Sequence, residues 1–274
     1  MSISEPDITV HGKRLNVVNR FTYLGSTLSQ NVTIDDEVDI RIARASASFG
    51  RLSAKVWNRR GLSIDTKLKV YKAVVLPTLL YGCETWTVYQ RHAKKLNHFH
   101  TTCLRKLLNV RWQDKVPDTV VLQRAASSSI NTILMQCQIR WAGHVVRMPD
   151  HRIPKRLFYG ELQLGKRTKG GQRKRFKDSL KSSLKDFNID TETWEEMATD
   201  RAKWRSLMHK GAALSERNRT LAAEEKRRAR KLRASIDDNG DGIPCPHCQK
   251  TFRARIGLTS HLRTHQPKVQ RVNE

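Results

Sequence analysis

Four residues near the end of the 274-residue chain constrain its local structure more than any other feature. Two residues separate Cys245 from Cys248, twelve separate Cys248 from His261, and three separate His261 from His265. Two thiolates and two imidazoles at this spacing suit tetrahedral zinc. A module of about 25 residues is too short to fold on hydrophobic burial alone. We therefore predict that residues 244–267 fold around one Zn²⁺ held by Cys245, Cys248, His261 and His265.

Residues between the ligands favour the ββα arrangement of a Cys2His2 zinc finger. Phe252 is predicted to lie in the second strand, Leu258 is predicted to lie on the helix, and both supply a small core. His247, between the two cysteines, is predicted to be an exposed turn residue rather than a ligand.

The finger helix lacks side chains that discriminate strongly between bases. The positions that usually contact bases hold Ala254, Ile256, Gly257 and Ser260. None of these makes the bidentate pair of arginine with guanine or asparagine with adenine. We expect the finger to position the chain on phosphates through Arg253, Arg255 and Arg263.

Positive charge is the dominant feature of the composition. The chain has 52 Lys and Arg against 26 Asp and Glu, a formal net charge of +26. Residues 151–234 hold 24 basic and 11 acidic residues, a higher density of net charge than the 22 and 11 of residues 1–150. Such a charge predicts a polyanionic partner, most often nucleic acid. Besides the finger arginines, the predicted contacts form two clusters: Lys166, Arg167, Lys169, Arg173, Lys174 and Arg175, and Lys226, Arg227, Arg228, Arg230 and Lys231.

Other compositional features exclude several classes of protein. No run approaches 18 apolar residues and no signal-peptide pattern opens the chain, so we expect neither a membrane nor a secreted protein. Five scattered cysteines do not form a disulfide scaffold. Cys83, Cys103 and Cys137 each sit among apolar residues and are predicted to be small buried hydrophobes.

Apolar periodicity predicts a mainly α-helical chain. A stripe from Val38 to Val56 has helical spacing, with Thr33 and Asp36 as its predicted capping box. Arg41, Arg44, Arg51 and Lys55 lie off this stripe and predict a basic outer face. Further helices are predicted from Ser63 to Pro77, from Leu96 to Val110 and from Ile130 to Val145. Together they predict a helical domain over residues 31–150.

The segments on either side of this domain have different patterns. Residues 1–30 predict extended structure, with a hairpin turn at His11-Gly12 and a short strand from Phe21 that ends at Gly25. Residues 151–236 predict a basic loop at 160–175 and helices with stripes from Phe176 to Phe187 and from Trp194 to Trp204. They end at 215–236 in a solvated basic helix, or in a tail that becomes ordered on a phosphate backbone. Residues 237–243 are predicted to be a linker.

No catalytic constellation is present. Gly160 and Gly165-Lys166 resemble a phosphate-binding loop, but Arg167 stands where Ser or Thr must bind Mg²⁺, and no hydrophobic strand precedes it. Asp35-Asp36 resembles a pair of metal-binding carboxylates, but the helix dipole accounts for acidic residues at a helix N-terminus.

Three segments carry a resemblance to a known family. They are Phe21-x-Tyr23-Leu24-Gly25-Ser26, the stretch from Lys69 to Trp86 with Leu79-Leu80-Tyr81-Gly82 inside it, and Arg140-Trp141-Ala142-Gly143-His144. Over about residues 8–210 the chain resembles reverse transcriptases of LINE-type (non-LTR) retrotransposons. The resemblance implies that residues 1–30 are the remnant of a palm edge and that the helices are a thumb-like region that grips template and primer.

The chain departs from this family where catalysis takes place. The family's polymerase needs an aromatic-x-Asp-Asp turn and an upstream aspartate, and neither occurs here. Because the segment before Phe21 is short, we expect this chain to contain neither the fingers and palm nor an endonuclease. We expect a C-terminal fragment that is not an enzyme.

The leading hypothesis is a zinc-dependent, nuclear fragment of such a polymerase that binds nucleic acid, RNA or DNA, largely without sequence specificity. One alternative is a protein-interaction module whose finger docks a partner protein. Another is an inert retroelement relic.

Overall fold

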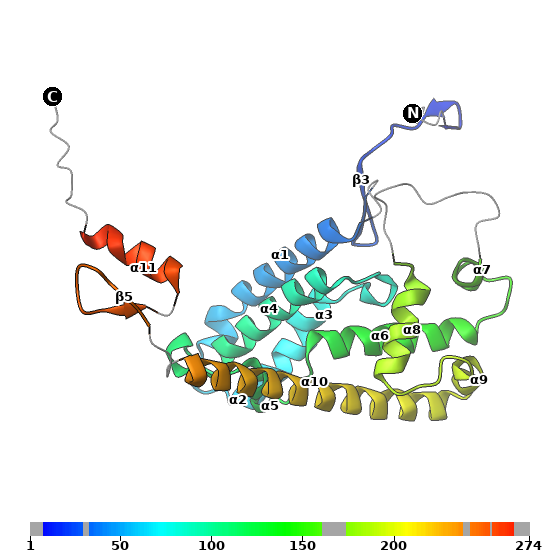
Figure 1. Ribbon diagram of the computed structural model, residues 1–274. Helices are drawn as coiled ribbons and strands as arrows, with labels where there is room; N and C mark the ends of the chain where they lie inside the picture. Colours follow the sequence, from blue (N-terminus) through cyan, green and yellow to red (C-terminus); the bar gives the residue numbers. More distant parts are fainter. Residues whose placement is uncertain (1–7, 30–32, 161–173, 238–241, 253, 266–274) are drawn as a thin grey trace. The chain divides into compact units, whose positions relative to one another are not determined.

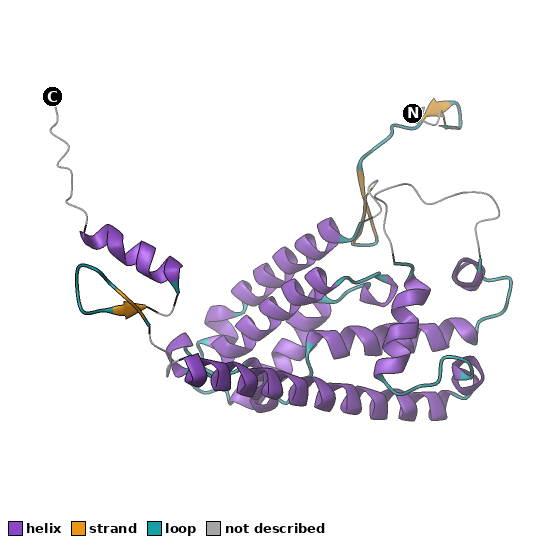
Figure 2. Ribbon diagram, in the orientation of Figure 1, coloured by secondary structure: helices purple, strands orange, loops and turns teal. Residues whose placement is uncertain are grey.

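The computed structural model describes residues 8–29, 33–160, 174–237, 242–252 and 254–265. Its contacts divide the chain into two compact units, residues 1–218 and 219–274, here called the helical unit and the C-terminal unit (Figure 1). Helices dominate the described residues, and strands occur only as short pairs, so the predicted fold class is confirmed at this level (Figure 2). The predicted domain boundaries stay predictions.

Two antiparallel hairpins lie at the start of the described chain. Their strands are β1 (Thr9–Val10) with β2 (Lys13–Arg14), and β3 (Arg20–Tyr23) with β4 (Ser26–Ser29). His11 and Gly12 turn the first hairpin with φ values of 48° and 74°, and Leu24 and Gly25 turn the second with 46° and 81°. Two-residue turns with positive φ at both positions match the twist of the flanking strands. The predicted turn at His11-Gly12 is confirmed. The strand predicted from Phe21 to Gly25 is correct for Phe21 to Tyr23 but too long, because Leu24 and Gly25 form the turn to β4.

Helices account for most of the remaining described residues. In chain order they are α1 (Asp35–Arg51), α2 (Ile64–Val70), α3 (Leu76–Leu79), α4 (Gln90–Leu107), α5 (Asp118–Arg124), α6 (Ile130–Val146), α7 (Ile153–Tyr159), α8 (Phe176–Asp186), α9 (Trp194–Thr199), α10 (Arg201–Asp237) and α11 (Arg255–Leu262). Short π-helical segments at Ser53–Trp57 and Tyr71–Val75 and 3₁₀ turns at Cys83–Thr85, Trp112–Asp114 and Arg263–His265 complete the set. None of the described helices is both long enough and apolar enough to span a bilayer.

The predicted capping box of the first helix is wrong. Helix α1 begins at Asp35 with Ile34 at its N-cap, and the side chain of Ile34 makes no capping hydrogen bond. The Arg91 guanidinium lowers the pKa of the Asp35 carboxyl to about 2, against the opposing effect of burial and with help from His92. A carboxylate that stays charged stabilises the positive end of the helix dipole, so charge replaces the predicted cap.

Two helix ends also differ from the prediction. The helix that begins after Ser63 does not stop at Pro77, because a π-helical segment precedes the proline and places it in the first turn of α3. The stripe from Trp194 to Trp204 belongs to two helices. They separate at Asp200, whose side chain accepts hydrogen bonds from the backbone N–H groups of Ala202 (2.8 Å) and Lys203 (3.1 Å).

The predicted basic outer face of α1 is wrong at Arg41. The Arg41 and Glu37 side chains are only 5% and 4% exposed, and Arg41 Nε donates to Glu37 Oε1 at 2.7 Å. Arg41 Nη2 donates to the carbonyl of Gly25 at 2.5 Å, and Glu37 Oε2 accepts from the N–H of Thr27 at 2.7 Å. A buried ion pair therefore holds the β3–β4 turn against α1.

Helix α6 contributes to both hydrophobic cores of the helical unit. The larger core contains side chains from every helix from α1 through α6 in chain order. Its fully buried residues include Val38, Tyr71, Leu96, Leu104 and Ile130. The second joins α6 to α8, α9 and the first part of α10, with Ile139, Leu184, Phe187, Trp194 and Trp204. Cys83 and Cys103 are buried as predicted, whereas Cys137 is half-buried.

Close packing of α6 on α10 depends on Gly143. A Cβ atom at Gly143 would lie 2.1 Å from Trp204 Nε1 and 2.7 Å from Trp204 Cδ1, and the Trp204 side chain is 3% exposed. Because a buried indole cannot move without disturbing its neighbours, only glycine lets these helices approach so closely.

We expect Gly143→Ala to destabilise the helical unit by about 3 kcal/mol, because overpacking forces side chains and backbone to shift. Its Tm should fall by about 6–12 °C in a thermal unfolding experiment. The matched control is Gly50→Ala in α1, where an added Cβ meets nothing within 4 Å. An unchanged Tm for Gly143→Ala would show that the packing adapts easily.

Candidate zinc centre and basic surface

The C-terminal unit contains a small ββα module. Strand β5 (Ile243–Pro244) pairs with β6 (Thr251–Phe252), and α11 follows with Ala254 at its N-cap. The backbone N–H of Cys245 donates to the carbonyl of Lys250 at 2.8 Å and closes the loop that carries both cysteines. His247 is exposed in this turn, as predicted.

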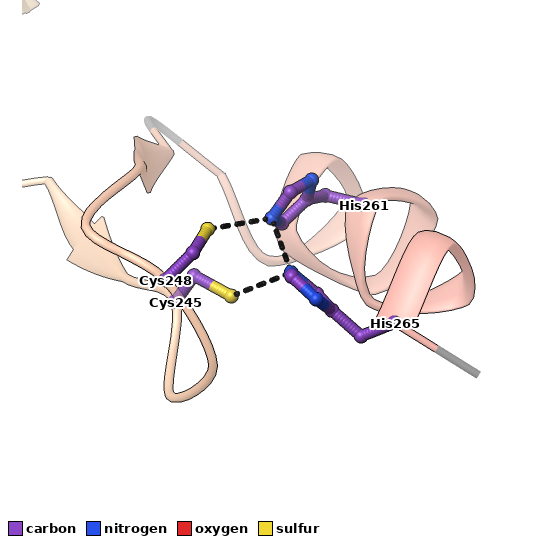
Figure 3. A group of neighbouring side chains, drawn as sticks. All are labelled: Cys245, Cys248, His261 and His265. Carbon is purple, nitrogen blue, oxygen red and sulfur yellow. Dashed lines mark hydrogen bonds between the residues drawn. The ribbon is translucent and has the colours of Figure 1, made fainter. Parts of the chain in front are cut away.

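Predicted zinc ligands from both ends of the module converge on one point (Figure 3). Their ligand atoms all lie within 4.8 Å of one another. His261 Nε2 lies 3.2 Å from Cys248 Sγ and 3.0 Å from His265 Nε2, and His265 Nε2 lies 3.6 Å from Cys245 Sγ. Ligands held 2.0–2.3 Å from a tetrahedral zinc ion lie about 3.3–3.8 Å apart. The three separations of 3.0–3.6 Å are close to this spacing, so the donor set suits the metal.

Local electrostatics favour the protonation states that bind metal. Burial, followed by the charges of His265 and Lys250, lowers the pKa of His261 and favours the neutral imidazole. Burial opposes ionisation of the Cys245 thiol, but hydrogen bonds from the backbone N–H groups of His247 and Cys248 and from the Cys248 thiol lower its pKa below the usual value. A neutral imidazole and a thiolate are the forms that bind zinc.

The finger helix presents few groups able to recognise a particular base. Ala254, Ile256 and Ser260 are exposed, and Ile256 is 82% exposed. Two of the three predicted phosphate contacts, Arg255 and Arg263, are also exposed, whereas Arg253 lies outside the described residues. This surface suits a polyanion better than a defined base sequence.

The first predicted basic cluster lies mostly outside the described residues, which exclude Lys166, Arg167, Lys169 and Arg173. Lys174 and Arg175 are exposed at the start of α8. The backbone N–H of Lys174 donates to Tyr89 Oη at 3.1 Å, and that of Arg175 donates to Asp178 Oδ2 at 2.8 Å. These bonds attach the end of the cluster to the helical unit.

The second predicted cluster lies on the last part of α10, within the C-terminal unit. Residues 219–237 hold seven basic and three acidic residues. Lys226, Arg228, Arg230 and Lys231 are exposed, and Arg227 is half-buried. Lys226 and Arg230 are four residues apart and share one face of the helix. The arrangement places several cations along one helix, as contacts to a phosphate backbone require, but binding by either cluster stays a prediction.

Comparisons with known proteins reveal relatives that come from mobile elements. The chain is 24% identical over 212 residues to an uncharacterized transposon-derived protein of Caenorhabditis elegans, and the match covers 74% of each chain. It is 25% identical over 114 residues to the RNA-directed DNA polymerase from mobile element jockey of Drosophila funebris. It is 29% identical over 96 residues to a protein of Drosophila melanogaster named "Probable RNA-directed DNA polymerase from transposon X-element".

The chain is related to LINE-type retrotransposon proteins. The two polymerase matches cover 41% and 34% of this chain but only 12% and 10% of the polymerases. No protein-family model and no solved structure matches the chain. The predicted resemblance is therefore confirmed as a relation to these elements.

One feature of the helical unit was not predicted. A pocket of about 440 Å³ opens between α6, α7 and α8 and is lined by Trp141, Leu157, Phe158, Phe176 and Lys177, among others. Trp141 and Phe176 belong to predicted helical stripes, but periodicity shows only that each side chain faces a neighbour. Which rings meet depends on the packing of three helices.

Proposed function

We propose that this chain is a zinc-dependent, nucleic-acid-binding region derived from a retrotransposon reverse transcriptase, that it acts in the nucleus, and that it lacks polymerase activity. The observation that carries the proposal is the convergence of Cys245, Cys248, His261 and His265 in a chain with a net charge of +26. Zinc would fix the fold of the finger, and the cations would bind RNA or DNA largely without sequence specificity.

The relatives support a partner of this chemical class. The polymerases that the chain resembles are named as RNA-directed DNA polymerases, which handle both RNA and DNA. Absence of polymerase activity is proposed from the sequence, since no aromatic-x-Asp-Asp turn occurs in this chain. The role left to it is to hold nucleic acid.

Salt dependence of binding tests this proposal. Neutralisation of six phosphates gives a slope of roughly −5 for log affinity against log salt on duplex DNA. Between 50 and 200 mM salt the affinity should then fall by about a thousandfold. A filter-binding titration with the zinc-loaded full chain measures the slope, and a slope shallower than about −2 would contradict the proposal.

Two triple variants test which lysine and arginine residues contact the phosphates. Replacement of Lys226, Arg230 and Lys231 by glutamine should reduce the steepness of the slope by up to about 3, because each lost phosphate contact removes about 0.9. The control replaces the exposed residues Lys55, Arg59 and Arg60, which gives the same net charge. Equal effects of the two triple variants would show that only total charge matters and would contradict the assigned cluster.

A further inference from the structure

The pocket between α6, α7 and α8 combines aromatic walls with an apolar lip. Trp141 and Phe176 are 5.3 Å apart between ring centroids at 86°, and Phe158 lies 6.1 Å from Trp141 and 6.0 Å from Phe176. All three rings are half-buried, so each keeps part of its surface accessible. At the lip, Leu157 is 75% exposed and Ile153 is 68% exposed. Exposed apolar side chains that adjoin an aromatic pocket are typical of a ligand-binding groove.

Charge at the rim indicates what the pocket binds. Two cations, Arg175 and Lys177, line it, and none of the described residues that line it is acidic. Lys177 Nζ lies 5.9 Å from the Phe158 ring centroid and 5.6 Å from that of Tyr159, so its charge stays beside the aromatic wall. A volume of about 440 Å³ suits a small planar group. Stacking surfaces next to cations match an unpaired base and its phosphates.

We infer that this pocket binds one unpaired base of a single-stranded nucleic acid, with Lys177 and Arg175 beside the adjoining phosphates. This inference rests on the proposed function, to which it adds a base-stacking site outside the finger. The aromatic rings accept any base because every base has a π-face, so the site adds affinity for single strands without sequence specificity.

Comparison of two oligonucleotides with the same phosphates tests the site. The zinc-loaded full chain is titrated at one salt concentration with a thymidine oligonucleotide and with an abasic strand of equal length. Stacking contributes about 1–3 kcal/mol per base, so the thymidine strand should bind at least about fivefold more tightly. Its binding should also quench tryptophan fluorescence, and Trp141→Phe should remove much of that quenching.

Two variants assign the preference to the pocket. Leu157→Gln alters only the exposed lip, and Phe158→Leu removes the central ring while keeping an apolar side chain. Both variants should reduce the ratio of the affinities for the thymidine and abasic strands toward one. The affinity for the abasic strand itself should stay unchanged. Leu221→Gln is the control, because Leu221 is 49% exposed on α10 and does not line the pocket.

The same titrations separate failure of the site from failure of the proposed function. The base site is wrong if wild type and Leu157→Gln prefer the thymidine strand equally, or if wild type does not prefer it at all. The proposed function still holds in either case if the salt dependence of binding stays steep. The same outcome is expected if the pocket binds an apolar side chain of a partner protein, because removal of the bases would then not change the affinity. Absence of binding to either strand at low salt would contradict the proposed function itself.

Discussion

Chelation of zinc is expected to unfold residues 242–265 while the helical unit stays folded. The module has two strands of two residues each, and among its described residues only Cys245 is buried. Phe252 and Leu258 are half-buried and cannot supply enough hydrophobic stabilisation. Structural zinc supplies about 10–16 kcal/mol of apparent binding free energy at pH 7. The loss should appear as collapse of the dispersed amide resonances of the module and rapid proteolysis within it.

Cysteine variants separate loss of the metal from general damage. Cys248→Ser should abolish the visible absorption of Co²⁺ bound to thiolates, whereas Cys137→Ser should preserve it, because Cys137 lies on α6 in the helical unit. Thermal unfolding of the helical unit should be the same for Cys248→Ser and wild type. A module that stays protected from proteolysis in excess chelator would contradict the zinc-dependent fold.

Glu37→Ala is expected to destabilise the helical unit by about 3–5 kcal/mol, because it leaves the buried Arg41 guanidinium without its counter-charge. The same carboxylate also accepts the N–H of Thr27, so the β3–β4 hairpin should lose its attachment to α1. The midpoint of urea-induced unfolding measures the loss of stability. Hydrogen exchange at Thr27 measures the release of the hairpin.

Two comparisons make this prediction specific. Asp39 lies on α1 like Glu37 and forms an exposed ion pair with Lys95 of α4. Asp39→Ala removes this pair and should cost less than about 1 kcal/mol. Simultaneous replacement of Glu37 and Arg41 by Leu and Met should recover most of the stability, because the cost comes mainly from an unpaired buried charge. If Glu37→Ala costs no more than Asp39→Ala, then the buried pair does not hold the hairpin.

Features encoded by neighbouring residues could be predicted from the sequence. The stripe from Ile130 to Val145 predicts α6, and Ile130, Leu134 and Val145 of this stripe are buried. Ser63 caps α2 as its position predicts, with its side chain accepting from the N–H of Thr66. The Cys and His spacing likewise predicts the convergence of four ligand atoms, since fixed intervals determine where they lie on a knuckle and a helix.

Features that depend on contacts between distant residues could not be predicted in this way. Arg41 lies off the apolar stripe of α1 and looks solvent-exposed in sequence, but a hairpin 16 residues earlier buries it. The close approach of Gly143 to Trp204 and the aromatic pocket both require the packing of helices far apart in the chain. Local periodicity contains no information about which helix faces which.

Zinc content and oligonucleotide affinity, measured on the same preparation before and after chelation, test the central claim most directly. The account predicts one zinc per chain and an affinity that falls by about tenfold on chelation, or about 1.4 kcal/mol, and returns when zinc is restored. Chelator already saturated with zinc serves as the control for competition by its own negative charge. A chain that contains no zinc, or binds the oligonucleotide equally well with and without it, would contradict the account.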